Sequence, residues 1–385
     1  MTYFYSSRPT LGGSQVITLQ YADAWRSEGE TVRVVGSSLV DNPFLEKAAD
    51  QGFNVGVIKP PGLFKEFGKR YRDYGRVDLA SKVIATPLYY IRQALKLRAE
   101  GVKAVCVSTS RCVLQLGPAV RLAGLPLIYL AQGGLVAGGR LTRKAIVTLP
   151  SAVTCVSDAV RENIIYNGRK DDKINVIMNG IQDIENLVPD MNKNYILFAG
   201  NVVPEKGVHH LVTAYGHLDS ELKSRVRLRI AGKSWDREYD TYLRQLAGSE
   251  NVEFLGFRND VPSLMQGALM LVAPSVEEET VYYGGKSHRV IWKEGFCLSA
   301  LEGMRGGAPV VASNSYGLKE VVESGETGLL VEPSSVESLT RAIQDLIDHP
   351  DRARSMGEAG RRRFLDRFTA DRMQNEFVDF MRSVL

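Results

Sequence analysis

The feature that most constrains the fold of this chain is an alternation of short apolar runs with amphipathic stretches. The apolar runs are rich in β-branched residues, which is typical of strands buried on both faces of a parallel sheet. In the first half they lie at residues 3–5, 31–35, 55–58, 102–108, 127–131 and 153–156. Between them, apolar residues recur at helical spacing, as at Ile84, Leu88, Ile91 and Leu95. The alternation predicts an α/β fold in which helices cover both sides of parallel sheets.

The alternation restarts after a polar stretch at residues 182–193, which we interpret as a hinge. Six further strands are predicted at residues 195–200, 227–231, 252–255, 270–273, 309–312 and 328–331. A chain of 385 residues is long enough for two domains with separate cores. We therefore expect two Rossmann-like, doubly wound domains, at residues 1–185 and 186–368. A terminal amphipathic helix is expected at residues 369–385.

Composition narrows the class of protein. The net charge of +4 is small for this length, so a dedicated nucleic-acid binder is not expected. No apolar run reaches the roughly 18 residues of a membrane span, and no basic region followed by an apolar stretch marks a signal peptide. The four cysteines have no C-x-x-C spacing, which favours buried thiols over disulfides or zinc. We therefore expect a cytoplasmic protein.

Three loops that follow predicted strands carry candidate binding residues, because ligands of doubly wound sheets bind at the carboxyl ends of the strands. Gly12 and Gly13 follow the first strand and allow a ligand to approach the backbone, or they form a plain turn. They lack the G-x-G-x-x-G pattern of dinucleotide oxidoreductases. Lys206 could neutralise a diphosphate as a point charge, or be an exposed loop lysine. Residues 256–260 could wrap a nucleobase, or form a turn with Asp260 as N-cap.

Two glutamates, Glu294 and Glu302, bracket the start of a helix predicted at residues 298–305. The first backbone N–H groups of a helix lack intrahelical partners, and the positive end of the dipole favours an anion there. A carboxylate for a sugar, N–H groups for phosphate and a carboxylate for a ribose would form a nucleotide-sugar site. The alternative is a pair of solvated glutamates beside a core helix.

Five motifs in the second half occur in an order that is known from one enzyme family. They are GNVVPEKG at 200–207, APS at 273–275, EGFCLSALEGM at 294–304, GAPVVAS at 307–313 and GETGLLV at 325–331. On these motifs the chain resembles retaining nucleotide-sugar glycosyltransferases of the GT-B fold, in glycosyltransferase family four. In the first half the match rests on shorter stretches at residues 12–13, 156–157 and 179–181.

The resemblance implies a role for each matched residue. Glu294 would hold the hydroxyls of the donor sugar, Glu302 the ribose hydroxyls, and Lys206 the diphosphate. The terminal helix would cross back to the first domain. The catalytic residues would be Glu294, Lys206 and Gln132. The donor-binding residues would be Gly12, Gly13, Asn201, Lys206, Phe257, Arg258, Glu294, Gly295, Phe296, Cys297, Leu298, Ser299 and Glu302.

The resemblance also implies the reaction. The chain would be a metal-independent, retaining hexosyltransferase without a cofactor, and the absence of any D-x-D motif agrees with this. It would transfer a sugar from a nucleoside diphosphate, with UDP favoured, to a glycan, lipid-linked or small-molecule acceptor in polysaccharide biosynthesis. A catalytically inactive nucleotide-sugar-binding regulator and a nucleotide-sugar epimerase remain as alternatives.

Four positions depart from the family pattern. Asn201 stands where the family usually has Arg, Gln132 where it usually has His, and Cys297 where it usually has Gly. Replacement cations could come from Arg258, Lys286 or Arg289. Residues 276–293 form an insertion, which we interpret as a lid or a sugar-selecting loop.

The stretch at residues 59–76 is both basic and aromatic. It carries six bases and two acids, interleaved with apolar side chains. Such a segment can lie on an anionic membrane surface, where lipid-linked acceptors reside. The alternative is an ordinary solvated helix and loop.

Overall fold

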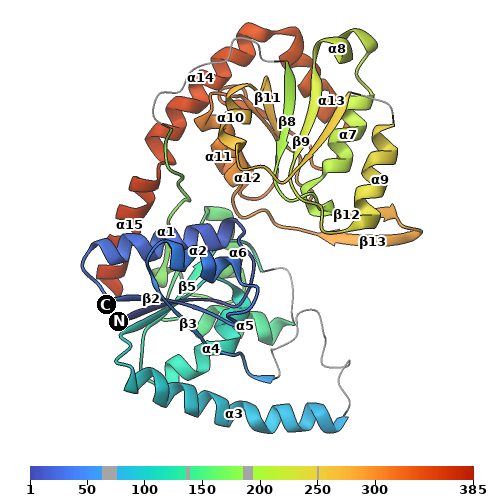
Figure 1. Cartoon of the computed structure of the whole chain (residues 1–385). Helices are drawn as coiled ribbons and strands as arrows, with labels where there is room; N and C mark the ends of the chain where they lie inside the picture. Colours follow the sequence, from blue (N-terminus) through green and yellow to red (C-terminus); the bar gives the residue numbers. More distant parts are fainter. Residues whose placement is uncertain (63–75, 136–138, 185–193, 249–250) are drawn as a thin grey trace. The chain divides into compact units, whose positions relative to one another are not determined.

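The computed structural model divides into two compact units (Figure 1). It describes all residues except 63–75, 136–138, 185–193 and 249–250. The N-terminal unit is Met1–Ile177 with Met373–Leu385, and the C-terminal unit is Met178–Arg372. The first unit thus ends at Ile177, before the expected boundary at residue 185. Most of the stretch interpreted as a hinge lies outside the described residues.

The N-terminal unit is built on a seven-stranded parallel sheet of order β3-β2-β1-β4-β5-β6-β7. Its strands are β1 Thr2–Ser6, β2 Val32–Gly36, β3 Asn54–Val57, β4 Ala104–Val107, β5 Leu127–Ala131, β6 Ala152–Cys155 and β7 Ile174–Val176. Its helices are α1 Gly13–Ser27, α2 Pro43–Asp50, α3 Arg76–Ala99, α4 Ser110–Leu122, α5 Arg140–Thr148 and α6 Asp158–Tyr166, with most of α15 Ala370–Val384. Six strands were predicted. The edge strand β7 was not, because it is short and only partly buried.

The C-terminal unit is built on a six-stranded parallel sheet of order β10-β9-β8-β11-β14-β15. Its strands are β8 Tyr195–Ala199, β9 Arg227–Ala231, β10 Val252–Gly256, β11 Met270–Ala273, β14 Val310–Ser313 and β15 Gly328–Val331. Its helices are α7 Val208–Gly216, α8 Ser220–Arg225, α9 Arg237–Ala247, α10 Val261–Gln266, α11 Leu298–Arg305, α12 Leu318–Val321, α13 Val336–Asp348 and α14 Pro350–Arg367. All six strands and the helix at 298–305 were predicted from the sequence.

Both sheets have a doubly wound order, in which chain connections run outward in both directions from a central strand. Since parallel crossovers are right-handed, the two directions place helices on opposite faces. The strand order reverses beside β1 in one sheet and beside β8 in the other. Ligands of such sheets bind at the carboxyl ends of the strands next to that reversal. This confirms the α/β fold class and directs attention to the loops after β8 and β11.

The insertion at residues 276–293 folds into an antiparallel hairpin of β12 (Glu278–Tyr283) and β13 (Lys286–Ile291). The turn consists of Gly284 and Gly285, both at positive φ, which favours glycine. Val281 and Tyr283 alternate with exposed residues and pack into the core of the C-terminal unit. The segment is therefore a packed element and not an irregular loop.

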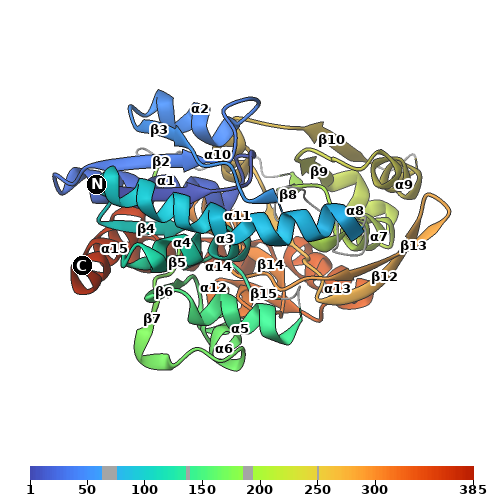
Figure 2. The same ribbon diagram turned by 90° about the horizontal axis from the view of Figure 1, so that it is seen from below.

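Helix α3 exposes the apolar residues whose spacing predicted the helix. It lies beside α4 (Figure 2). The Tyr90 hydroxyl on α3 donates to the Leu114 carbonyl on α4 at 2.8 Å. Ile84, Leu88 and Leu95 are 72%, 67% and 63% exposed. The helical period was correct, but these residues are not on the buried face. No helix among the described residues is long and apolar enough to cross a membrane.

Candidate functional site

The loops after β8, β9 and β10 are joined at the carboxyl edge of the C-terminal sheet. The Val202 N–H donates to the Lys233 carbonyl at 3.1 Å, and the Gly232 N–H donates to the Gly256 carbonyl at 2.8 Å. A Cβ on Gly232 would lie 1.7 Å from the Gly200 carbonyl oxygen, so only glycine permits this backbone contact. The three loops therefore form one continuous surface.

Lys206 is placed by a second close backbone contact. It ends a short 3₁₀ turn (Pro204–Lys206), and Gly207 follows with φ +66°. A Cβ on Gly207 would lie 1.9 Å from the Pro274 carbonyl oxygen. The Val276 N–H donates to the Glu205 carbonyl at 3.1 Å. These contacts hold the turn carrying Lys206 against the loop that follows β11.

The carboxylate of Glu294 is the centre of the site. Lys206 Nζ forms an ion pair with Glu294 Oε2, Ser275 Oγ donates to the same oxygen at 3.1 Å, and Trp292 Nε1 donates at 3.3 Å. The Glu294 side chain is 7% exposed and that of Lys206 is 24% exposed. Within the described part of the chain, Glu294 Oε1 has no donor of its own. That oxygen is the acceptor through which the carboxylate could bind a hydroxyl.

Helix α11 begins beside Glu294 without a side-chain cap. Its N-cap is Cys297, whose side chain makes no capping hydrogen bond, and its first turn carries no acidic residue. The segment leading into it is fixed by the Gly317 N–H, which donates to the Glu294 carbonyl at 3.0 Å. An uncapped helix start offers N–H groups and a positive partial charge to an anion.

Burial and charge shift three pKa values at this site. For Lys206, burial opposes the ammonium form, but the Glu294 carboxylate outweighs burial and the pKa is raised above its ordinary value. Burial, with the charge of Glu294, raises the pKa of the Cys297 thiol. Burial raises the pKa of Glu302 on α11, although Arg305 partly offsets it. Lys206 therefore stays cationic, and Cys297 stays a neutral thiol, at neutral pH.

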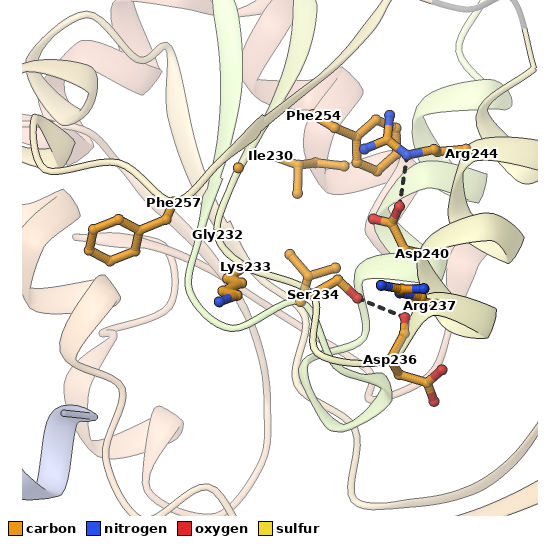
Figure 3. Close-up of a pocket in the computed structure, with 12 residues that line it drawn as sticks. Ile230, Gly232, Lys233, Ser234, Asp236, Arg237, Asp240, Arg244, Phe254 and Phe257 are labelled. Atoms are coloured by element: carbon orange, nitrogen blue, oxygen red, sulfur yellow. Dashed lines mark hydrogen bonds and ion pairs between the residues drawn. The ribbon is translucent and has the colours of Figure 1, made fainter. Parts of the chain in front are cut away.

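A pocket of about 440 Å³ lies at the carboxyl ends of β9 and β10 (Figure 3). Its lining includes Lys233, Ser234, Phe254 and Phe257. Phe257 is 73% exposed, so its ring is available for stacking. The pocket thus includes one of the residues expected to contact a nucleobase.

The structure brings some predicted site residues together and leaves others apart. Lys206 and Glu294 are in contact, Gly295 to Cys297 connect Glu294 to α11, and Leu298 and Ser299 are the first residues of that helix. Asn201 is exposed on the joined loops. Arg258 pairs with Asp260, with Nε 2.7 Å from Oδ1, and Arg289 pairs with Glu278 on the hairpin. Neither of these two cations joins the Glu294 cluster.

Gly12, Gly13 and Gln132 belong to the N-terminal unit. Gly12 is the N-cap of α1, and its N–H donates to Gln15 Oε1 at 3.2 Å. Gln132 follows β5 directly and is partly buried. All three therefore lie at the carboxyl ends of strands in their own sheet.

Sequence reasoning missed Ser275 and Trp292, the two neutral donors to Glu294. Ser275 was part of a quoted motif, but a serine after a strand carries no distinct signal. Trp292 stands two residues before Glu294, and an indole N–H needs a partner when it is partly buried. This requirement could have indicated from the sequence that Trp292 has a hydrogen-bond acceptor nearby.

Comparisons with known proteins agree with this geometry. Residues 181–363 match the family described as glycosyl transferases group 1. The chain is 27% identical over 284 residues to alpha-maltose-1-phosphate synthase of Mycolicibacterium smegmatis, a match covering 66% of this chain and 68% of that protein. It is 29% identical over 225 residues to an uncharacterized glycosyltransferase of Methanocaldococcus jannaschii, covering 58% and 57%.

Solved structures share the whole architecture. HepE of Anabaena, in complex with UDP, has a TM-score of 0.78 at 21% identity and covers 99% of each chain. A glycosyltransferase of Rickettsia africae has a TM-score of 0.78 at 18% identity, covering 100% of this chain and 98% of that one. The matched segment and the two parallel sheets confirm the resemblance inferred from the motifs: residues 181–363 match the group 1 glycosyl transferases, and the chain has the GT-B fold.

Proposed function

We propose that this chain is a retaining glycosyltransferase that takes its sugar from a nucleoside diphosphate, with UDP favoured. The observation that carries the proposal is the Lys206–Glu294 pair beside the uncapped start of α11. A cation, free helix N–H groups and a carboxylate with an open acceptor oxygen are the groups that a sugar diphosphate requires. HepE, which shares the fold, was solved with UDP and with UDP-glucose, and this supports UDP as the leaving group.

The roles of these groups follow from where negative charge develops during the transfer. The bond from the anomeric carbon to the diphosphate oxygen breaks, and the nucleoside diphosphate leaves with the negative charge. The acceptor oxygen bonds to the anomeric carbon from the same face, and its proton passes to the leaving phosphate. Donors that are already oriented toward the leaving oxygen bind the transition state more tightly than the substrate. Lys206 and the first N–H groups of α11 supply that stabilisation, and no protein base is needed.

Lys206 can serve the diphosphate while keeping its contact with Glu294. An ammonium group has three donors, and the ion pair uses one of them. All three contacts of Glu294 are to Oε2, so Oε1 remains for a hydroxyl of the donor sugar. Glu302, about one turn along α11 from the helix start, is assigned to the ribose hydroxyls, and the pocket bearing Phe257 to the base.

A donor-hydrolysis assay tests the proposal. We expect slow release of nucleoside diphosphate from one donor among UDP-, GDP-, ADP- and dTDP-sugars, which a thermal-shift screen would first identify. A ligand at 100 times its dissociation constant adds about 2.7 kcal/mol to stability. Glu294→Gln and Lys206→Ala should abolish the release. Lys223→Ala, on α8 at the opposite edge of the sheet, removes the same charge and should not.

Two other outcomes would replace the proposal. Donor binding without turnover, with every acceptor class, would favour a regulatory binding protein. Conversion of the donor to a second nucleotide sugar without any acceptor would favour an epimerase.

We further propose that the acceptor is lipid-linked and is met at a membrane surface. The support is the exposed apolar row Ile84, Leu88 and Leu95 on α3. The adjoining basic stretch at 59–76 lies largely outside the described residues. Replacing the three apolar residues with Ser should reduce binding to anionic liposomes, whereas Leu365→Ser on α14 should not. Unchanged binding of the triple variant would contradict a role for α3.

A further inference from the structure

A cluster of two histidines and one glutamate lies where the β12–β13 hairpin meets α7. His209 Nε2 is 2.9 Å from Glu279 Oε1, and His210 Nε2 is 2.6 Å from Glu279 Oε2. One ligand atom from each of the three residues lies within 4.8 Å of the others. The side chains of His209, His210 and Glu279 are 7%, 15% and 12% exposed. These groups take no part in the site described above.

The contact between His209 and Glu279 is not a hydrogen bond. Both His209 Nε2 and Glu279 Oε1 are buried without a hydrogen-bond partner, although the two atoms are 2.9 Å apart. Residue His209 is 6% exposed, so water does not compensate either atom. A buried polar atom left without a partner destabilises the folded state. A cation on the ring axis would satisfy both atoms.

The other nitrogen of His209 is already oriented. His209 Nδ1 lies 2.8 Å from the Tyr239 hydroxyl on α9. When Nδ1–H donates to that hydroxyl, Nε2 carries the lone pair and becomes the ligand atom. A metal-binding histidine almost always has such a partner on its second nitrogen. Tyr239 is fully buried, so packing holds the hydroxyl at this position.

We propose that His209, His210 and Glu279 bind a divalent transition metal of the Zn²⁺ class. Two imidazoles and a carboxylate are a known ligand set for zinc, with a fourth position left for water. Bonds of about 2.0–2.2 Å in a tetrahedral arrangement separate ligand atoms by roughly 3.3 Å. The 2.9 Å between His209 Nε2 and Glu279 Oε1 must therefore lengthen by about half an ångström, which small rotations of the side chains provide.

The metal has a structural role in this position. It joins the hairpin to α7, and each element leads directly to the Glu294 cluster. Residue 209 follows Lys206 by one short turn of chain, and β13 ends just before Trp292. The metal would thus hold the segments that carry Lys206 and Trp292, two of the three partners of the Glu294 carboxylate. It takes no part in breaking the diphosphate bond, so the donor chemistry and this site are tested separately.

Metal binding by untagged protein tests the proposal. After dialysis against a chelator, the protein should bind one Zn²⁺ per chain, measured by elemental analysis, and its unfolding temperature should rise on adding Zn²⁺. Co²⁺ should give visible absorption bands that Zn²⁺ then displaces. His210→Ala and Glu279→Gln should each lower the tightly bound metal at least tenfold. Glu278→Gln, the exposed neighbour on β12, and His217→Ala are matched controls that should keep it.

Three results on metal content would overturn the proposal. They are no tight metal in the wild type, equal metal content in Glu279→Gln, or loss of metal in the control Glu278→Gln. If His210→Ala does not fold, as judged by circular dichroism, His210→Gln replaces it. A wild-type unfolding temperature that neither chelator nor Zn²⁺ changes would also exclude the site, whatever the variants do.

Discussion

Replacing Lys206 by Met should destabilise the C-terminal unit, because it leaves the buried carboxylate of Glu294 without its cation. Breaking one side of a buried ion pair costs about 3–5 kcal/mol. Here Ser275 and Trp292 still donate to the carboxylate, and Lys206 is partly exposed. We therefore expect a loss of about 2–3 kcal/mol. Glu294→Gln removes the charge but keeps the shape, and leaves an ammonium that can reach water, so about 1–2 kcal/mol is expected.

The double variant Lys206→Met/Glu294→Gln measures the free energy of interaction between the two charges apart from the effects of their surroundings. With both charges gone, neither partner is left buried and unpaired, so the two losses should not add. The expected coupling is about 1–2 kcal/mol, against an additivity error of about 0.5 kcal/mol for independent sites. Urea unfolding in a Trp25→Phe background measures it, because the remaining tryptophans, Trp235 and Trp292, report on the C-terminal unit alone. The slope with urea should stay constant across variants.

The sign of the pH dependence provides a second check. The pKa of Lys206 is raised in the folded state, so its contribution is complete below the unfolded value of about 10.5 and is lost as pH rises through the folded value. The coupling should therefore be constant near neutral pH and fall in strong base. Additive losses at neutral pH, or an equal loss from Lys223→Met, would refute the reasoning about the pair.

Two further perturbations follow from the site. Gly207→Ala should destabilise by roughly 3 kcal/mol or more, because it combines a positive φ with a Cβ 1.9 Å from a backbone oxygen. Gly216→Ala, with open space around its Cβ, should be neutral or stabilising in the same thermal melt. Glu302→Gln should gain stability relative to the wild type as pH rises above about 4.5, because burial raises the pKa of Glu302 and penalises its ionised form. A stability difference that stays constant from pH 4 to 7 would contradict this. The same variant should still weaken nucleotide binding, measured by calorimetry, if Glu302 accepts from the ribose.

The local pattern of apolar and polar residues was sufficient to predict most of the secondary structure. Strands such as β5 and β11 are continuous apolar runs buried on both faces, so their composition is enough to predict that they are buried. Helix α11 was predicted with its observed bounds because its apolar spacing and the preceding loop agree. The ordered motifs also predicted that Lys206 and Glu294 belong to one site, and the structure places these two side chains in contact. The hairpin was missed, although Gly284-Gly285 between alternating residues is a turn signal.

Tertiary structure decided which residues meet and which faces are buried. The period of α3 is local, but the buried side depends on where α4 lies, and nothing near Ile84 specifies that. Ser275 and Trp292 both reach Glu294 because the antiparallel pairing of β12 with β13 returns the chain to the loop after β11, where the Trp292 N–H donates to the Glu277 carbonyl at 2.8 Å. His209 and Glu279 likewise meet only when β12 packs on α7. The spacing of apolar residues along a segment predicts which of its residues are buried. Which distant side chains meet depends on how the strands and helices pack together, and no single segment contains that information.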